Sequence, residues 1–283
     1  MPESTSILVL GGCLLHGPLN PRSRAGAGFN YPKYGPIPGT YTFGEMFQAI
    51  GILRGERDVP PEIRPLCALR PNFKAVPRAA EFSDVDVALI ELSSPIEIIF
   101  RGCNLHVPCL AQEIMNPIRN QSREAAKCMA TWFRSGLQAV DDDVRAMAAE
   151  ELVRFIPDTF ENAELMKAVI LETRSEKSEV LNGMARLQRL IGRPLGVVVY
   201  IFQYLADGRA ISWPADFHEE VKAACEKLNL PIFEPSILVN RYGVQAALRK
   251  DLRHYNDQFT PVIANALVDF ARVVSESSRA RAA

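Results

Sequence analysis

The sequence predicts an α/β fold in which a doubly wound parallel sheet is flanked by helices and interrupted by a helical insertion. Three observations lead to this prediction: short apolar runs recur along the chain, amphipathic helical patterns separate them, and one long stretch has helical composition almost throughout. Strands that alternate with helices are typical of a parallel sheet with both faces covered.

The first predicted strand covers residues 6–12, an apolar run that ends in two glycines and therefore leads into a tight turn. Residues 17–40 follow it. They are rich in glycine, proline and asparagine and lack helical periodicity, so they predict a long loop. We expect this loop to contact ligand, because it leaves the turn that follows the first predicted strand. Thr42 and Glu45 then have the spacing of a capping box, which predicts that a helix begins here.

Two further apolar runs, residues 84–92 and 195–202, predict central strands of a covered sheet, and residues 231–233 predict a short strand. Amphipathic helices are expected over residues 214–228, where Pro stands near the first helical position, and over residues 261–275. Strand and helix therefore continue to alternate to the end of the chain.

The helical stretch covers residues 112–190. It interrupts the alternation, so we expect an insertion or lid within a single domain of residues 1–283. Because functional segments of α/β proteins gather at the carboxyl edge of the sheet, the insertion is expected to cover that edge.

Composition and charge exclude several classes of protein. The chain has 283 residues, of which 48% are hydrophobic and 23% charged, as in an ordinary globular protein. A net charge of -1 gives no field that would attract nucleic acid or an anionic membrane. Apolar stretches too short for a membrane span and a start without a basic leader predict a cytoplasmic protein.

Six irregularly spaced cysteines predict free thiols. The oligomeric state, including a homo-oligomer, is left open.

Cys13 lies in the turn after the first predicted strand, where ligands bind in open parallel sheets. If a helix begins there, its unpaired backbone N–H groups would stabilise a thiolate and bind an oxyanion. The alternative is an inert cysteine that packs at the end of a core strand.

The second candidate feature is Asp251, three residues before His254 and just ahead of the last predicted helix. An aspartate at this spacing can hold one imidazole nitrogen, so that the other nitrogen accepts the proton of a nucleophile. The alternative is a solvated pair on a surface turn.

Together these features resemble the SGNH/GDSL hydrolase family. That family opens with a strand leading to Gly-Asp-Ser, whose serine is the nucleophile, and ends with Asp-x-x-His before a C-terminal helix. In this chain Gly11-Gly12-Cys13 stands at the first place and Asp251 to His254 at the second. The cysteine is similar to SGNH-like relatives, namely the proteins named for a Gly-Ser-Cys-Phe-Ala motif and capsule-biosynthesis acyltransferases with Gly-Asn-Cys. The resemblance implies an SGNH- or flavodoxin-like sheet and a triad of Cys13, His254 and Asp251.

The chain departs from the family where the rest of the oxyanion hole is expected. Residues 67–76 contain no glycine, and Ser93 and Ser94 stand in the place of the family's asparagine motif. We therefore expect Gly12 and Leu14, through the backbone near Cys13, and the two serine hydroxyls to form the oxyanion pocket.

Other polar residues are candidates for substrate binding or for metal. Cys103, His106 and Cys109 are spaced such that zinc is an alternative to a polar loop with two incidental thiols, although we assign no metal. Candidate substrate-binding residues are those near Cys13, in the basic loop and at the capping box, namely His16, Arg22, Arg24, Lys33 and Glu45.

The resemblance implies acyl transfer from an ester or thioester, with water or a carbohydrate hydroxyl as acceptor, in an esterase or an acyltransferase of polysaccharide biosynthesis. No cofactor is required, and acyl-coenzyme A is one donor whose phosphates Arg22, Arg24 and Lys33 would meet. The alternative function is a ligand-binding or scaffold protein that keeps the fold without turnover.

Overall fold

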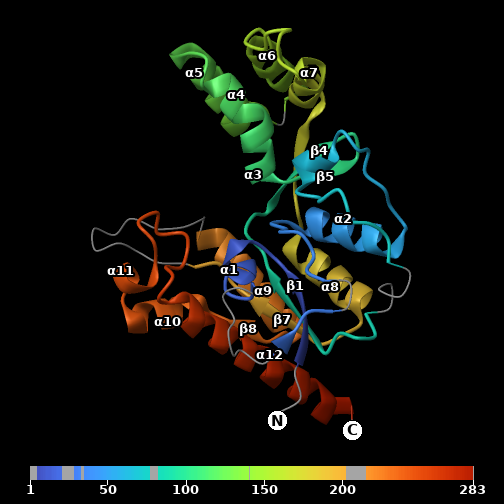
Figure 1. Ribbon diagram of the computed structural model, residues 1–283, viewed down its shortest axis with the longest axis vertical. Helices are drawn as coiled ribbons and strands as arrows, with labels where there is room; N and C mark the ends of the chain where they lie inside the picture. Colours follow the sequence, from blue (N-terminus) through green and yellow to red (C-terminus); the bar gives the residue numbers. More distant parts are fainter. Residues whose placement is uncertain are drawn as a thin grey trace. The chain divides into compact units, whose positions relative to one another are not determined.

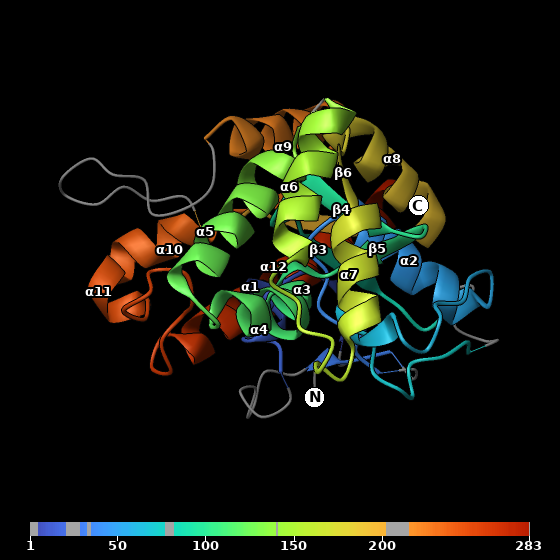
Figure 2. The ribbon, with the colours of Figure 1, turned by 90° about the horizontal axis from the view of Figure 1, so that it is seen from above.

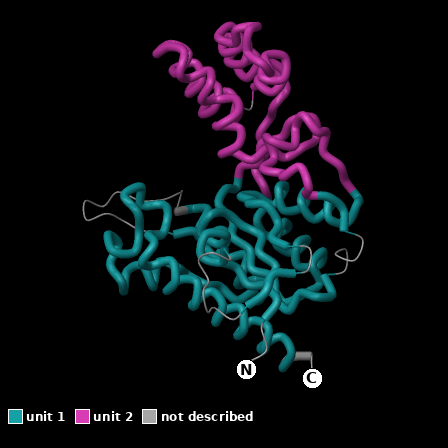
Figure 3. The backbone as a smooth tube through the Cα atoms, viewed as in Figure 1, with its two compact units in different colours: residues 1–56, 74–95, 179–283 teal, residues 57–73, 96–178 magenta. Residues whose placement is uncertain are grey.

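The computed structural model describes residues 5–20, 29–32, 35–76, 82–139, 141–201 and 215–282. The chain divides into two compact units (Figure 3). Unit 1 consists of residues 1–56, 74–95 and 179–283, and unit 2 consists of residues 57–73 and 96–178. Unit 2 therefore begins earlier in the chain than the insertion predicted at residues 112–190, and the last part of that stretch belongs to unit 1.

Unit 1 contains a five-stranded sheet with the order β2-β1-β3-β7-β8, in which every pairing is parallel. The prediction of a doubly wound parallel sheet is confirmed. In the register, Ile7 lies opposite Val87 and Val197 opposite Ile232. The strands are β1 (Thr5–Leu10), β2 (Phe29–Asn30), β3 (Val87–Glu91), β7 (Leu195–Val198) and β8 (Ile232–Phe233).

Four of these strands match the predicted apolar runs, whereas β2 lies inside the segment predicted as loop. Two residues are too few for hydrophobic alternation to reveal a strand, so the pairing of Phe29 with Thr5 could not be predicted. The chain passes from β1 outward to β2 and then returns to β3 on the other side of β1. The carboxyl ends of β1 and β3 thus form the topological switch point, where such sheets bind ligands.

Helices cover both faces of the sheet (Figure 1). Ile7 and Leu89 share a core cluster with Ile263 and Leu267 of α12 (Thr260–Ala282), so α12 covers their face. Neighbouring strand residues such as Leu8 point to the opposite face and are also buried, which requires a second layer. That layer contains α2, α8 and α9, and Figure 2 shows α8 and α9 side by side. Their bounds are α2 (Phe43–Arg54), α8 (Val180–Ile191) and α9 (Ala215–Leu228).

The predicted capping box at the start of α2 is present. The backbone N–H of Glu45 donates to Oγ1 of Thr42 over 3.3 Å, and the Glu45 carboxylate accepts the N–H of Tyr41. Glu45 is thereby committed to the helix start. The other helices of unit 1 are α1 (Cys13–His16), α10 (Pro235–Tyr242) and α11 (Val244–Ala247).

Unit 2 contains a three-stranded antiparallel sheet with the order β5-β4-β6 and a group of helices. Its strand β6 lies within the stretch predicted to be helical. The strands are β4 (Ile96–Phe100), β5 (Cys103–Leu105) and β6 (Arg174–Lys177). The helical segments are η1 (Arg64–Cys67), α3 (Val107–Leu110), η3 (Ala111–Met115), α4 (Asn116–Arg119), α5 (Arg123–Thr131), η4 (Trp132–Gly136), α6 (Asp142–Val153) and α7 (Ala163–Glu172).

The core of unit 2 forms around Trp132, which is completely buried. Its indole N–H donates to the carbonyl oxygen of Ile170 over 3.2 Å, so the ring is fixed against α7.

All six cysteines of the chain carry free thiols, as predicted. Among the described helices, none is both long and apolar enough to cross a membrane.

The close approach of α12 to the sheet depends on Gly196 in β7. A Cβ atom at Gly196 would lie 2.7 Å from Cε1 of Phe270 and 2.9 Å from Cδ2 of Leu89. We expect Gly196→Ala to lower the free energy of unfolding by about 1–3 kcal/mol through overpacking. Gly39→Ala is the matched control, because a Cβ there has 3.8 Å to its nearest neighbour, the Gly11 carbonyl oxygen. Urea unfolding that gave equal stability for the two variants would contradict this packing.

Candidate functional site

Cys13 is the first residue of α1 and directly follows the turn that ends β1, at the switch point of the sheet. Two glycines allow this turn to lie close to its neighbours. A Cβ at Gly11 would lie 2.7 Å from Cβ of Glu91, and a Cβ at Gly12 would lie 2.6 Å from Cε1 of Tyr41. The glycines therefore bring Cys13 against the end of β3 and the ring of Tyr41.

Asp251 and His254 lie in the turn between α11 and α12. Leu252 adopts a left-handed conformation (φ 56°), and the N–H of Arg249 donates to the His254 carbonyl oxygen over 2.8 Å. Asp251 Oδ1 accepts the backbone N–H groups of Arg253 and His254 over 2.9 and 3.1 Å. Its Oδ2 lies 2.6 Å from Nδ1 of His254. The predicted Asp-His contact is therefore present, and the turn itself holds the carboxylate.

These hydrogen bonds also keep Asp251 ionised. Partial desolvation alone would raise the pKa of its carboxyl group, but the N–H of Arg253, the His254 ring and the N–H of His254 outweigh it and lower the pKa to about 2. At neutral pH the carboxylate accepts the hydrogen bond from Nδ1, which leaves Nε2 of His254 as the proton acceptor.

The structure brings Cys13 and His254 to one cavity of about 610 Å³. Three residues of the loop after α1 also line it, and the expected contact of this loop with ligand stays a prediction. The lining residues are Cys13, Gly17, Pro18, Asn20, Arg249, His254, Tyr255, Asp257, Thr260 and Pro261. A thiol and an imidazole thus lie on the wall of a single cavity.

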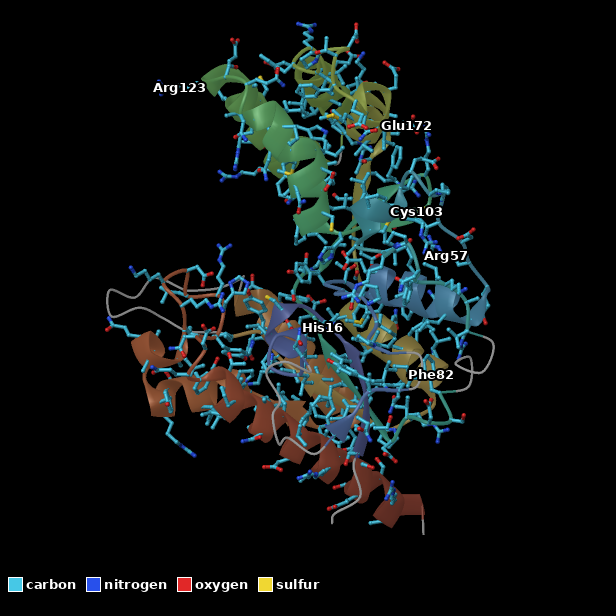
Figure 4. All side chains as sticks on the ribbon, viewed as in Figure 1. His16, Arg57, Phe82, Cys103, Arg123 and Glu172 are labelled. Atoms are coloured by element: carbon cyan, nitrogen blue, oxygen red, sulfur yellow. The ribbon has the colours of Figure 1, made fainter. Side chains whose placement is uncertain are left out.

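The other predicted substrate-binding residues are placed differently. His16 ends α1 (Figure 4), and among the described residues neither His16 nor Glu45 lines the cavity. Arg22, Arg24 and Lys33 lie outside the described residues. The expected meeting of these basic residues with phosphate groups therefore stays a prediction.

Glu91 is a site residue that the sequence analysis did not identify. It ends β3 and is fully buried. Its Oε2 accepts the N–H of Leu15 over 3.0 Å and its Oε1 accepts the hydroxyl of Ser93 over 2.8 Å, while the N–H groups of Gly12 and Leu14 also bond to this carboxyl group. Burial raises the pKa of Glu91 to about 7 against these hydrogen bonds. A lone glutamate inside an apolar strand was the available signal.

Glu91 engages most of the groups expected to form the oxyanion pocket. The N–H groups of Gly12 and Leu14 and the Ser93 hydroxyl bond to its carboxyl group, and the N–H of Ser94 donates to the Tyr41 carbonyl oxygen over 3.1 Å. The N–H of Cys13 itself lies at its own sulfur. The start of α1 is therefore occupied by an internal carboxyl group.

For the same reason the Cys13 thiol is not activated by the start of the helix, contrary to the expectation from sequence. Desolvation and then the charge of Glu91 raise the pKa of the thiol to about 11, against the N–H of Cys13 and the Tyr41 hydroxyl, which lower it. At neutral pH Cys13 is a neutral thiol, so its deprotonation requires a base.

Three tyrosines that interact electrostatically with Cys13 were also missed, because no spacing in the sequence connects them. Tyr41 hydrogen-bonds through its hydroxyl to the Cys13 sulfur. Burial, followed by the charge of Cys13, raises the pKa of Tyr200 to about 12. The same two causes raise the pKa of Tyr41 well above its usual value. Burial and then Glu91 raise the pKa of Tyr255 well above its usual value. All three phenols are therefore neutral hydrogen-bond donors at neutral pH.

The three candidate zinc ligands lie in unit 2. Cys103 is in β5, His106 is the N-cap of α3, and Cys109 lies within α3. Within the part of the chain that is described, no group of three His, Cys, Asp or Glu residues is arranged to hold a metal ion. Cys103 instead hydrogen-bonds to Arg57, and Figure 4 shows the two residues near each other. The geometry gives the zinc alternative no support.

The raised pKa of Cys13 can be tested by alkylation. We expect iodoacetamide to modify Cys13 at pH 8 more slowly than a model thiol, because little thiolate is present when the pKa is about 11. Glu91→Gln removes the charge while keeping an oxygen acceptor, and should accelerate the reaction. Cys225 is the internal control, because burial alone raises its pKa, to about 12. Peptide mass spectrometry that found Cys13 more reactive than the model thiol would contradict this account.

Comparison with known proteins identifies a family for the chain. The family model described as the TviD N-terminal domain matches residues 5–270, which includes the whole Cys13 cavity. The match agrees with the resemblance to capsule-biosynthesis acyltransferases. No curated protein and no solved structure is significantly similar to the chain. The chain belongs to the family of TviD N-terminal domains.

Proposed function

We propose that this chain is an acyltransferase of capsule polysaccharide biosynthesis in which Cys13 is the nucleophile, His254 the general base and Asp251 the residue that orients the base. The observation that carries the proposal is the shared cavity of Cys13 and His254, together with the 2.6 Å contact between Asp251 and Nδ1 of His254. Membership of the TviD N-terminal domain family supports an acyltransferase of this kind.

The protonation states of the site fit this division of roles. Asp251 stays ionised because its pKa is about 2, and it directs Nε2 of His254 toward accepting a proton. Cys13 is protonated because its pKa is about 11. A thiol of this kind attacks only when its proton is removed during the reaction, which is what a positioned imidazole does.

In the proposed reaction the Cys13 sulfur attacks the carbonyl carbon of an ester or thioester, and His254 takes the thiol proton. The C–O or C–S bond to the leaving group then breaks, and His254 returns the proton to that group. An acceptor hydroxyl, deprotonated by His254, attacks the acyl-cysteine and releases the thiol. We propose acyl-coenzyme A as the donor and a carbohydrate hydroxyl as the acceptor, since thioesters exchange readily with a cysteine.

A second function is favoured by one observation. Because Glu91 raises the pKa of Cys13 and occupies the N–H groups of Gly12 and Leu14, the site lacks two usual aids to acyl transfer. A protein that binds ligand in the cavity without turnover would have the same features. The formation of an acyl-cysteine separates the two functions, because only the acyltransferase forms a covalent bond to the acyl group.

The three proposed catalytic residues should behave as one unit. Cys13→Ala and His254→Ala should each abolish acyl transfer, and the double variant should be scarcely worse than either, because the two residues act on the same step. Asp251→Asn should lower kcat by up to about ten-thousand-fold. His218→Ala in α9 is the control, since His218 does not line the cavity. Steady-state rates that showed additive losses at Cys13 and His254 would mean that they serve different steps.

The acyl intermediate should be trapped on Cys13. Incubation with acetyl-coenzyme A and no acceptor should give a protein acetylated at Cys13, detected by peptide mass spectrometry, and Cys13→Ala should give none. Cys13→Ser should acylate far more slowly, because an alcohol has a higher pKa than a thiol and depends fully on His254. If neither acetyl-coenzyme A nor p-nitrophenyl acetate acylates the wild-type protein, the ligand-binding function is the correct one.

A further inference from the structure

The hydroxyl group of Tyr255 is buried without a hydrogen-bond partner. The side chain is only 5% exposed, and within the described part of the chain its oxygen has no hydrogen-bond partner. Other buried side chains there also have an unpartnered polar atom, but Tyr255 is the one that lines the Cys13 cavity. Because buried polar groups are nearly always paired, an unpaired hydroxyl on a residue that lines a cavity indicates a group that a ligand completes.

The chain holds Tyr255 firmly in this position. Its backbone pairs with Leu248 in an antiparallel bridge, and its ring packs against Phe259 at a centroid distance of 5.6 Å. It directly follows His254, so the same turn positions both residues. After burial, the charges of Glu91 and Cys13 raise the pKa of its phenol.

The acyl transfer proposed above requires a hydrogen-bond donor for the carbonyl oxygen of the acyl donor. Attack on a carbonyl carbon places negative charge on the carbonyl oxygen, and donors aimed at that oxygen are usually the largest contribution to catalysis. The N–H groups of Gly12 and Leu14 and the hydroxyl of Ser93 are bound to Glu91, and the hydroxyl of Tyr41 is bound to the Cys13 sulfur. The Tyr255 hydroxyl, by contrast, is buried without a partner among the described residues.

We propose that Tyr255 is a catalytic residue whose phenolic hydroxyl donates a hydrogen bond to the carbonyl oxygen of the acyl donor while Cys13 attacks. This inference rests on the proposed acyl transfer. As the S–C bond forms, the electron pair of the C=O double bond moves to the oxygen and the thiol proton moves to His254. Tyr255 keeps its own proton throughout. When the tetrahedral intermediate collapses, the C=O bond forms again and the leaving group takes the proton from His254.

Two reactions of Cys13 separate this role from a merely structural one. Acetylation by p-nitrophenyl acetate passes through an oxyanion, whereas alkylation by iodoacetamide depends on the same thiolate and forms no oxyanion. Tyr255→Phe should therefore slow acetylation about 100-fold, as the loss of one oxyanion donor does. Alkylation should change by no more than about twofold. The melting temperature should stay equal or rise, because an unpaired buried hydroxyl has been removed.

Tyr242→Phe is the matched control. Tyr242 packs against the same Phe259, at a centroid distance of 5.1 Å, but its side chain is 47% exposed and it does not line the cavity. This variant should acetylate at the wild-type rate. An equal loss in both variants would show that packing on Phe259, and not the Tyr255 hydroxyl, controls the rate.

Other outcomes would also overturn the inference. Wild-type acetylation in Tyr255→Phe would show that the hydroxyl does not bind the oxyanion. Equal slowing of acetylation and alkylation would show that Tyr255 acts on the thiol, and a lower melting temperature would show that its hydroxyl has a structural partner. A failure of the proposed function itself is distinguishable, because Cys13→Ala would then hydrolyse p-nitrophenyl acetate at the wild-type rate whatever residue stands at 255.

Discussion

The buried carboxyl group of Glu91 is the interaction on which the rest of the site depends. It ends the central strand β3 and accepts hydrogen bonds from the N–H of Leu15 and the hydroxyl of Ser93, so it joins β3 to the short helix that begins at Cys13. A charged group in a core is unfavourable unless its hydrogen bonds are satisfied, and here the turn after β1 satisfies them. The glycines at 11 and 12 are required because side chains there would collide with Glu91 and Tyr41.

This arrangement fixes the position of Cys13 at the expense of its reactivity. A free helix start would favour a thiolate, but a start that already faces a carboxyl group does not. The pKa of Cys13 is instead raised to about 11, so the proposed reaction needs a base such as His254 to remove the thiol proton. A cysteine with such a pKa is protected from adventitious oxidation and alkylation, because it is the thiolate that reacts. The Asp251 turn orients the imidazole of His254, which lines the same cavity.

Phenolic groups have a larger part in this site than the resemblance to SGNH hydrolases implies. The glycine and asparagine donors of that family have no counterpart in the matching segments of this sequence, and tyrosines interact with Cys13 instead. A buried phenol with a high pKa suits an oxyanion, because it donates a hydrogen bond at neutral pH without ionising. In this chain the proposed nucleophile and base therefore stand in a different hydrogen-bonding environment.

The sequence by itself determined the features that depend on local patterns. Apolar runs located β1, β3, β7 and β8, the Thr42 and Glu45 spacing located the start of α2, and the Asp-x-x-His spacing located a pair whose contact a single turn can make. Local spacing could not reveal β2, whose two residues are recognised only by pairing with β1, or β6 within a largely helical stretch. Only the tertiary structure showed that Glu91 meets the Cys13 turn across 76 positions of sequence, and that Tyr41, Tyr200 and Tyr255 interact electrostatically with the thiol. Electrostatic effects on a pKa depend on distance in space and on burial, and neither is encoded in the spacing of residues along the chain.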